Sequence, residues 1–293
     1  MSYYILNFVA WLISLMPMRM VIWLSYPLGW LTWHASGTKR NSTLKNLQAC
    51  YPEMEEAERL ALARESMRYY TLNILETGLA WHGSRNRINR LFDEPVGYEH
   101  LEQALAEDRG LLLLVPHFGN WELINQWSKK YFYLTSLYKP GSNTSLDAKL
   151  LAKRRRLGAG MVPANRSGLK QIYKCIQNNQ TVALLPDQEP SAGQGRFAPF
   201  FGVPALTGVL APRLLQRTGC LALFVVGKRM GNGRYQTHFI PAEEGIYSAD
   251  MDEALAAMNR GVERCVEVDS AQYLWAYKRF RRRPEGEPRF YGG

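Results

Sequence analysis

The residues of this chain best suited to chemistry lie in one short stretch, His117-Phe-Gly-Asn-Trp-Glu122. The apolar run Leu111–Val115 and Pro116 precede it, which predicts a buried strand that ends just before the histidine. A carboxylate close to a histidine can hold one ring nitrogen and leave the other free to remove a proton. The stretch contains no serine or cysteine nucleophile. We therefore interpret it as a general base that activates a substrate hydroxyl for direct acyl transfer.

The local sequence predicts how these two side chains are presented. Gly119 permits a tight turn, and Asn120 is a good residue to cap a helix that begins directly after it. Glu122 would then lie in the first turn of that helix. The same pattern also fits a surface histidine beside a glutamate that only favours the helix dipole. A zinc site is not expected, because the pair lacks the two histidines, four residues apart, of a zinc-protease helix.

A second candidate region follows the predicted strand Val182–Leu185. It consists of Asp187 and the glycine-rich loop Ser191–Gly195, whose backbone amides could bind a phosphate or an oxyanion. Neither nucleotide-binding glycine fingerprint is present, so nucleotide binding is not expected. Three aromatic residues beyond the loop could line an acyl-chain channel or simply pack into the core: Phe197, Phe200 and Phe201.

Cations are concentrated in two runs, and the chain has 36 Lys and Arg against 26 Asp and Glu, a net charge of +10. This excess favours an anionic partner, which could be nucleic acid, phospholipid or an acidic carrier protein. In the run Lys153–Arg156, Arg154 or Arg156 could bind phosphate or stabilise an oxyanion, and Arg166 is a further candidate. The second run, Lys278–Arg283, could bind nucleic acid, anionic lipid or an acidic carrier.

The N-terminal segment Tyr3–Trp33 favours the lipid and carrier alternatives, because it has one formal charge, Arg19, and four tryptophans. As one helix it would be roughly 46 Å long, against roughly 30 Å for a bilayer core, and Pro17 and Pro27 would kink or break it. We expect either a tilted spanning helix or two shorter interfacial helices. A buried core helix is the alternative. The basic residues that follow place the rest of the chain on the cytoplasmic side.

The remainder of the chain alternates strand and helix patterns, which predicts a single α/β domain with a central mixed, largely parallel sheet flanked by helices. We divide the chain into an N-terminal anchor, residues 1–36, and a globular domain, residues 37–293. Ligands in such folds bind at the carboxyl ends of the strands. His117 and Asp187 both follow strand ends, so we expect them to face one cleft. The four scattered cysteines are expected to be free thiols in a reducing compartment.

Taken together and in order, these segments resemble the late lipid A acyltransferases of Gram-negative bacteria, which add lauroyl or myristoyl chains to Kdo-lipid A. The likeness covers nearly the whole chain. Its matching pieces are the hydrophobic N-terminus, Arg40–Leu47 with Tyr51-Pro-Glu53, Leu75-Glu76, Pro116–Glu122, Tyr138-Lys-Pro140, Asp187–Pro190, Phe200-Phe-Gly202 with Ala205–Gly208, and Tyr277–Pro284.

The resemblance implies an α/β fold like that of glycerol-phosphate acyltransferases, attached to the bacterial inner membrane with its active domain on the cytoplasmic side. It implies acyl carrier protein, or coenzyme A, as the acyl donor, and a hydroxyl on a lipid A precursor as the acceptor. No metal or organic cofactor is expected, and no nucleic acid partner. The loop Ser191–Gly195 carries fewer charges than expected opposite a phosphorylated sugar.

The resemblance also implies roles for individual residues. His117 corresponds to the catalytic base and Glu122 to its partner. Asp187 and an arginine, Arg154 before Arg156, correspond to substrate-binding or charge-stabilising positions. Backbone amides of residues 119–121, with Asn120 among them, are the expected oxyanion donors.

Three alternatives stay open at this point. The first is an acyltransferase of the same superfamily that acts on another lipid or on a glycan-linked acceptor. The second is a non-catalytic protein that binds lipid or carrier protein at the membrane surface. The third is a nucleic-acid-binding protein, whose binding would weaken steeply with salt.

Overall fold

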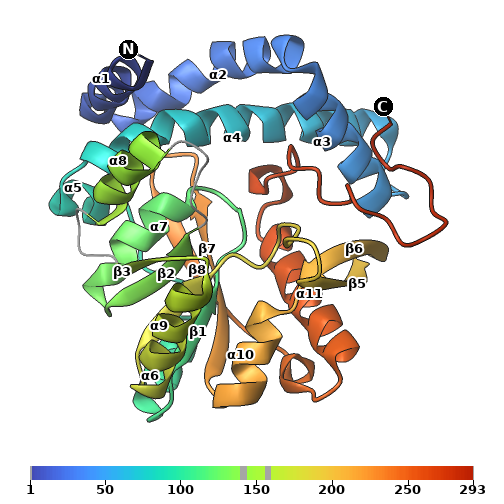
Figure 1. The fold of residues 1–293 in the computed structure, drawn as a ribbon. Helices are drawn as coiled ribbons and strands as arrows, with labels where there is room; N and C mark the ends of the chain where they lie inside the picture. Colours follow the sequence, from blue (N-terminus) through green and yellow to red (C-terminus); the bar gives the residue numbers. More distant parts are fainter. Residues whose placement is uncertain (1, 139–143, 156–159, 293) are drawn as a thin grey trace.

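The centre of the molecule is a six-stranded sheet in the order β3-β2-β4-β1-β7-β8 (Figure 1). The structure is a computed structural model that describes residues 2–138, 144–155 and 160–292. Every neighbouring pair in the sheet is parallel except β7 and β8, which are antiparallel. The predicted mixed, largely parallel sheet is therefore confirmed. Its strands are β1 (Leu111–Leu114), β2 (Leu134–Tyr138), β3 (Gly160–Pro163), β4 (Thr181–Leu184), β7 (Leu221–Arg229) and β8 (Tyr235–Pro241).

Helices cover both faces of this sheet, which explains why β1 is apolar at every position. Leu112 and Leu114 point into a core shared with α9, α10 and α11. Leu111 and Leu113 point into a second core shared with α4, α6 and α7. Successive side chains of a strand face opposite sides, so a strand covered on both sides must be apolar throughout. The helices are α3 (Gly37–Cys50), α4 (Glu56–His82), α5 (Arg85–Arg90), α6 (Tyr98–Ala106), α7 (Trp121–Trp127), α8 (Thr144–Arg155), α9 (Arg166–Gln177), α10 (Leu210–Thr218) and α11 (Met251–Glu267), with 3₁₀ turns at Ser128–Lys130, Glu244–Tyr247 and Ser270–Gln272.

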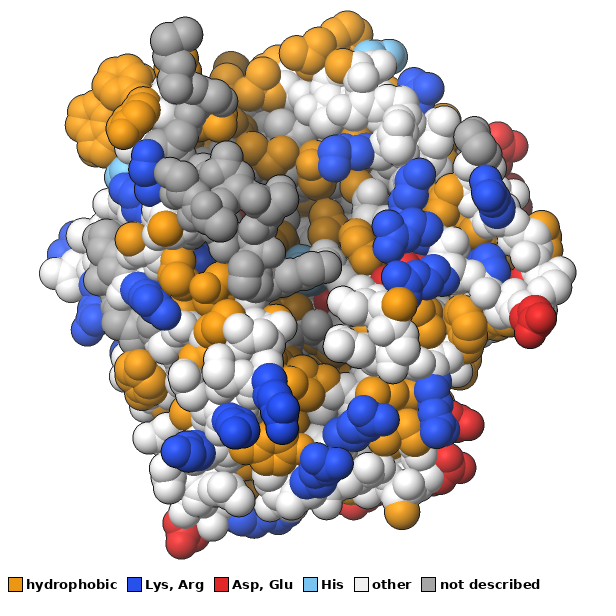
Figure 2. Space-filling view, viewed as in Figure 1, with side chains coloured by type: hydrophobic (Ala, Val, Ile, Leu, Met, Phe, Trp, Pro, Cys, Tyr) orange, Lys and Arg blue, Asp and Glu red, His pale blue; other side chains and the backbone are white. Residues whose placement is uncertain are grey.

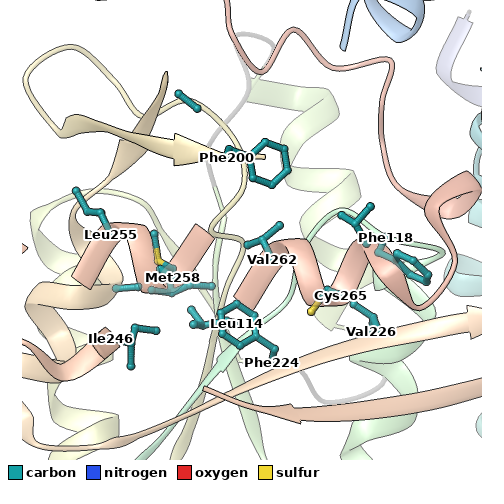
Figure 3. Close-up of a cluster of buried hydrophobic side chains, with 14 of the residues drawn as sticks. Leu114, Phe118, Phe200, Phe224, Val226, Ile246, Leu255, Met258, Val262 and Cys265 are labelled. Atoms are coloured by element: carbon teal, nitrogen blue, oxygen red, sulfur yellow. The ribbon is translucent and has the colours of Figure 1, made fainter. Parts of the chain in front are cut away.

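One of these cores is closed by α11 lying directly across the sheet (Figure 3). Met258, Val262 and Cys265 of this helix pack with Leu114 and Phe224 of the strands. A β-carbon at position 261 would lie 2.2 Å from the Phe224 ring, so the helix approaches this closely only because residue 261 is glycine. All four cysteines are free thiols in the structure, as predicted.

A separate antiparallel hairpin of β5 (Gly195–Phe200) and β6 (Val203–Gly208) packs against α11. The hairpin ends at Gly208, and α10 begins at Leu210. The hairpin is bonded to α11 through the buried Asn259, whose Nδ2 donates to the Pro199 carbonyl at 2.8 Å and to Thr207 Oγ1 at 3.1 Å. These contacts join residues 60 and 52 positions apart, so local sequence could not reveal them.

The N-terminal segment forms two helices, α1 (Ser2–Leu15) and α2 (Met18–Ala35), which lie along α4 (Figure 1). The alternative of one continuous spanning helix is wrong, because the chain breaks at Pro17, whose ring prevents the helical hydrogen bond. Pro27, in contrast, is accommodated inside α2. In the described part of the chain, no helix combines the length and the apolar character needed to cross a bilayer.

Glycines set the distance between these helices and α4. A β-carbon at Gly78 would lie 2.1 Å from the backbone oxygen of Ala10, and one at Gly29 would lie 2.9 Å from the α-carbon of Arg68. Both obstacles are backbone atoms, which cannot turn aside as a flexible side chain can. The close crossing of α1 and α2 over α4 therefore depends on these two glycines.

We predict that Gly78→Ala lowers the melting temperature, although alanine is the better helix former by about 1 kcal/mol. Overpacking of this kind costs about 1–3 kcal/mol. The matched control is Gly37→Ala in α3, where an added β-carbon meets nothing within 4 Å, so it should be neutral or slightly stabilising. Thermal unfolding of both variants tests this, and equal stability of the two would contradict the close helix crossing.

Candidate active site

Two parallel strands bring the candidate catalytic residues together at one edge of the sheet. Leu114, the last residue of β1, pairs in register with Leu184, the last residue of β4. His117 and Asp187 each follow three residues later. Because both strands run in the same direction, both loops emerge at the same edge. The two residues do meet at this edge, but only His117 lines the cavity described below, and Asp187 is buried behind it.

His117 and Asp187 are joined by two hydrogen bonds. His117 Nδ1 lies 2.8 Å from Asp187 Oδ1, and the His117 backbone N–H donates to Oδ2 at 2.9 Å. The carboxylate is 2% exposed, and burial alone would raise its pKa, yet the His117 imidazole and these hydrogen bonds hold the pKa of Asp187 below its ordinary value. An ionised carboxylate can only accept, so Nδ1 is the donor in this hydrogen bond. Gln188 Nε2 lies 3.1 Å from His117 Nε2.

Glu122 has a different partner from the one we expected. Its carboxylate accepts hydrogen bonds from Arg154, at 2.8 Å from Nε and also from Nη2, and the position on His117 Nδ1 belongs to Asp187. The reason is the direction of α7, which begins at Trp121 and carries Glu122 toward the end of α8. The Trp121 ring packs edge-on against the imidazole, with 4.7 Å between ring centroids.

The loop that carries His117 is held from the other side by the segment after α11. The Gly119 N–H donates to the Gln272 carbonyl at 3.0 Å, and the Leu274 N–H donates to the His117 carbonyl at 3.0 Å. Gly119 has a positive φ of 53°, and a β-carbon there would lie 2.3 Å from the Gly227 oxygen, so glycine is required. Because its N–H is already bonded, the Gly119 amide does not serve as the oxyanion donor expected from sequence.

Asn120 has two structural roles, of which the sequence predicted one. Its Oδ1 accepts from the Leu123 N–H at 3.1 Å, which is the predicted helix cap. Its Nδ2 donates to the buried carboxylate of Glu76 at 3.3 Å. Both ends of the side chain are occupied and it is 4% exposed, so it supports the loop and does not face a substrate.

A cavity of about 610 Å³ opens at this site, a volume within the usual range for small-molecule sites. Its polar groups include His117, Glu122, Arg154 and Gln188. Figure 2 shows a hollow in the centre of this face. The remaining wall is largely apolar and includes Leu113, Val115, Ile124, Trp127, Phe132, Leu134, Leu137, Met161, Leu169, Leu184, Val225, Phe239 and Met258.

Several predicted site residues lie elsewhere. Arg166 is exposed at the first position of α9 and is not part of the cavity wall. Arg156 lies outside the described residues. Of the two alternatives for the three phenylalanines, the acyl channel is excluded for this cavity, because none of them lines it. Phe200 is 1% exposed and packs in the core beside Tyr273. Ser191 and Gln194 of the glycine-rich loop do reach the cavity wall.

Two residues of the site were missed from sequence. Gln188 belongs to the Asp-Gln-Glu-Pro segment, and its place directly after Asp187 was the available signal. Tyr273 is buried next to Asp187, and burial together with that carboxylate raises the pKa of the phenol well above its ordinary value. Nothing in the sequence linked Tyr273 to Asp187, which lies 86 positions away.

A histidine bonded to a buried aspartate at the carboxyl ends of parallel strands, opening on an apolar cavity with an arginine beside it, is the arrangement of an α/β enzyme that uses a general base on an apolar substrate. Comparison with known families makes this specific. The family model described as bacterial lipid A biosynthesis acyltransferase matches residues 1–282. The chain belongs to this family.

Curated relatives agree with this assignment. A lipid A biosynthesis lauroyltransferase of Escherichia coli K12 is 30% identical over 97% of this chain and 92% of its own length. A palmitoleoyltransferase of the same organism is 27% identical with the same coverage. A myristoyltransferase, again from that organism, is 26% identical over 85% of this chain and 77% of its own length. The chain is thus similar to lipid A acyltransferases named for three different acyl groups.

We predict that Asp187→Asn destabilises the protein by about 1–3 kcal/mol near neutral pH, because it removes a charge-assisted hydrogen bond. The folded-state pKa of Asp187 is depressed, so its contribution is complete above the ordinary value of 3.8 and is lost as pH falls through the folded value. The stability difference between wild type and variant should therefore shrink in acid. Urea unfolding across pH measures it. The control is Asp252→Asn, an exposed carboxylate paired with Arg196, which should change little; a pH-independent difference for Asp187→Asn would contradict the assignment.

Proposed function

We propose that this protein transfers a fatty acyl chain from acyl carrier protein, or coenzyme A, to a hydroxyl of a lipid A precursor at the cytoplasmic face of the inner membrane. The observation that carries the proposal is the His117–Asp187 pair at the polar end of a largely apolar cavity. An imidazole fixed in this way can remove a proton, and the apolar wall can hold a hydrocarbon chain. The relatives, which are lipid A acyltransferases by name, support the acceptor class.

In the proposed reaction, Asp187 keeps the proton on Nδ1, and Nε2 removes the proton of the acceptor hydroxyl. The hydroxyl oxygen attacks the thioester carbonyl, and the carbon–sulfur bond breaks. The leaving thiolate then takes the proton from the imidazolium, so the base is regenerated and the products are an ester and a thiol. The buried Asp187 carboxylate stabilises the transient imidazolium.

Arg154 is the proposed oxyanion stabiliser. It lines the cavity with His117, and its guanidinium is fixed by Glu122, which is 12% exposed. A cation held in place before the reaction stabilises the developing negative charge without reorganisation. In this scheme Glu122 acts on the arginine and not on the histidine.

Direct transfer without an acyl-enzyme is favoured by the partner of His117 Nε2. That partner is the Gln188 amide, and among the described residues no serine, threonine or cysteine is hydrogen-bonded to the imidazole. Gln188 must give way to the acceptor hydroxyl, which then occupies the same position on Nε2. A nucleophile would need that position for itself.

Attachment to the membrane is proposed through α1 and α2. Their outer surfaces expose large apolar side chains, among them Trp11, Trp23 and Trp30, with exposed fractions of 41%, 80% and 66%. Hydrophobic side chains gather at the top of Figure 2, where Figure 1 places these helices. Apolar patches with exposed tryptophans fit the interfacial arrangement of two short helices.

We predict that His117→Gln lowers acyl transfer from an acyl carrier protein thioester to the lipid A precursor by about 10²–10⁴-fold, the usual contribution of a general base. Thermal unfolding should show that the variant stays folded. His100→Gln, in α6 and away from the cavity, is the control and should keep full activity. Mass spectrometry of the product lipid measures transfer, and wild-type turnover by His117→Gln would exclude the proposed base.

We predict that replacing Trp11, Trp23 and Trp30 together by alanine reduces binding to phospholipid vesicles at least about tenfold, because each indole favours the interface. The side chains are exposed, so the fold should survive. Tyr133→Ala, an equally exposed aromatic outside α1 and α2, is the control. Vesicle flotation measures the binding, and unchanged flotation of the triple variant would rule out these helices as the attachment surface.

A further inference from the structure

A second cavity, of about 270 Å³, lies next to the candidate active site. Its wall is formed by Lys39, Tyr70, Leu274, Ala276, Tyr277, Lys278 and Arg281. Lys39 lies in the first turn of α3, and Lys278 and Arg281 belong to the basic run near the C-terminus. Folding therefore gathers three cations from opposite ends of the sequence around one small space. Figure 2 shows Lys and Arg side chains gathered beside the central hollow on this face.

The charges in this cavity are only partly balanced. Arg281 is paired with Glu189 at 3.3 Å. Neither lysine forms an ion pair with a carboxylate in the described part of the chain. Each lies over an aromatic ring: Lys39 Nζ is 4.6 Å from the Tyr70 ring centroid, and Lys278 Nζ is 5.5 Å from that of Tyr291. Both lysines are half-buried. Two partly desolvated ammonium groups without an anion form a place where an anion would be bound strongly.

Two hydrogen bonds tie the wall of this cavity to the loops that carry His117 and Gln188. The Leu274 N–H donates to the His117 carbonyl at 3.0 Å. The Tyr277 hydroxyl accepts from the Glu189 N–H at 3.0 Å, and Glu189 directly follows Gln188, the partner of His117 Nε2. An anion in this cavity and a hydroxyl at His117 can therefore belong to the same molecule.

The cavity also lies on the side of the molecule from which a lipid would arrive. Lys39 follows α2 by only four residues, and Tyr70 belongs to α4, the helix on which α1 and α2 pack. The apolar helices α1 and α2 therefore pack on the same helix, α4, that contributes Tyr70 to the wall of this cavity. A lipid headgroup at the membrane surface can reach the cavity without leaving the bilayer.

We propose that Lys39 and Lys278, with Arg281 beside them, bind a phosphate group of the acceptor lipid and so place its hydroxyl at His117. This inference rests on the proposed function and adds a headgroup site to it. Phosphate is the favoured anion because two lysines and an arginine line one small cavity, which suits a compact group with several acceptor oxygens. The acyl donor is not expected to contact this second cavity, because its thioester must enter the apolar cavity beside Arg154.

The test compares wild type with Lys39→Gln/Lys278→Gln, on the acceptor lipid before and after enzymatic removal of its phosphate groups. We expect the double variant to lose about tenfold or more in kcat/KM for the phosphorylated acceptor. For the dephosphorylated acceptor, the double variant and wild type should be equal. The donor KM should not change. Lys39→Arg/Lys278→Arg keeps the charges and should retain most activity, and Lys174→Gln, an exposed lysine of α9, is the control for charge alone.

A binding measurement keeps this site testable apart from catalysis. Flotation with phosphatidylcholine vesicles, with and without the phosphorylated acceptor lipid, should show that the lipid strengthens binding of wild type and not of the double variant. A wild type that binds in this way but transfers no acyl chain would refute the proposed function and leave the headgroup site supported. An equal effect of the lipid on both proteins, an equal loss for both acceptors, or a loss confined to the donor KM would overturn the headgroup site.

Discussion

The feature on which much of this structure depends is the buried ion pair of Glu76 and Arg229. Their side chains are 0% and 2% exposed, and Arg229 Nε donates to Glu76 Oε1 at 2.7 Å. Although burial disfavours the charged form, the Glu76 carboxylate keeps the pKa of Arg229 above its ordinary value. Removal of one member of such a pair costs about 3–5 kcal/mol, because the other is left buried and unpaired. The pair therefore fixes α4 against the end of β7.

Hydrogen bonds lead from this pair to both sides of the molecule. Glu76 accepts from Asn120, which caps α7 in the loop after His117, and the Arg229 backbone exchanges two hydrogen bonds with the Gln272 side chain, at 2.8 and 2.9 Å. Gln272 in turn accepts from Gly119. The same helix α4 supports α1 and α2 through glycine contacts. These contacts run without a gap from α4 to the loop of His117. The position of the imidazole relative to the proposed membrane surface therefore depends on α4.

The sequence allowed prediction wherever the determining contacts are periodic or follow strand direction. Continuous apolar runs predicted the doubly covered sheet, and parallel strands predicted that His117 and Asp187 meet. The expected bond between His117 and Glu122 is absent, and Glu122 is bonded to Arg154 instead. Spacing along the chain could not show this, because it does not say which way a helix turns its first side chains. The buried position of Phe200 was equally hidden, since it depends on the pairing of the β5–β6 hairpin with α11, far away in sequence.

The proposed site separates the groups that would carry out the reaction from the apolar wall that would bind the acyl chain. The polar groups at this end of the cavity are held by side-chain partners: Asp187 by His117, Arg154 by Glu122, Asn120 by Glu76. A change at any of them leaves a charge or a hydrogen-bonding group without its partner, which is costly. The apolar side chains of the wall have no hydrogen-bond partners to lose. One hydrocarbon side chain can replace another there at a cost below about 1.5 kcal/mol when volume is kept. Changes of volume in the apolar wall are therefore less costly to this fold than changes of charge at the polar end of the cavity.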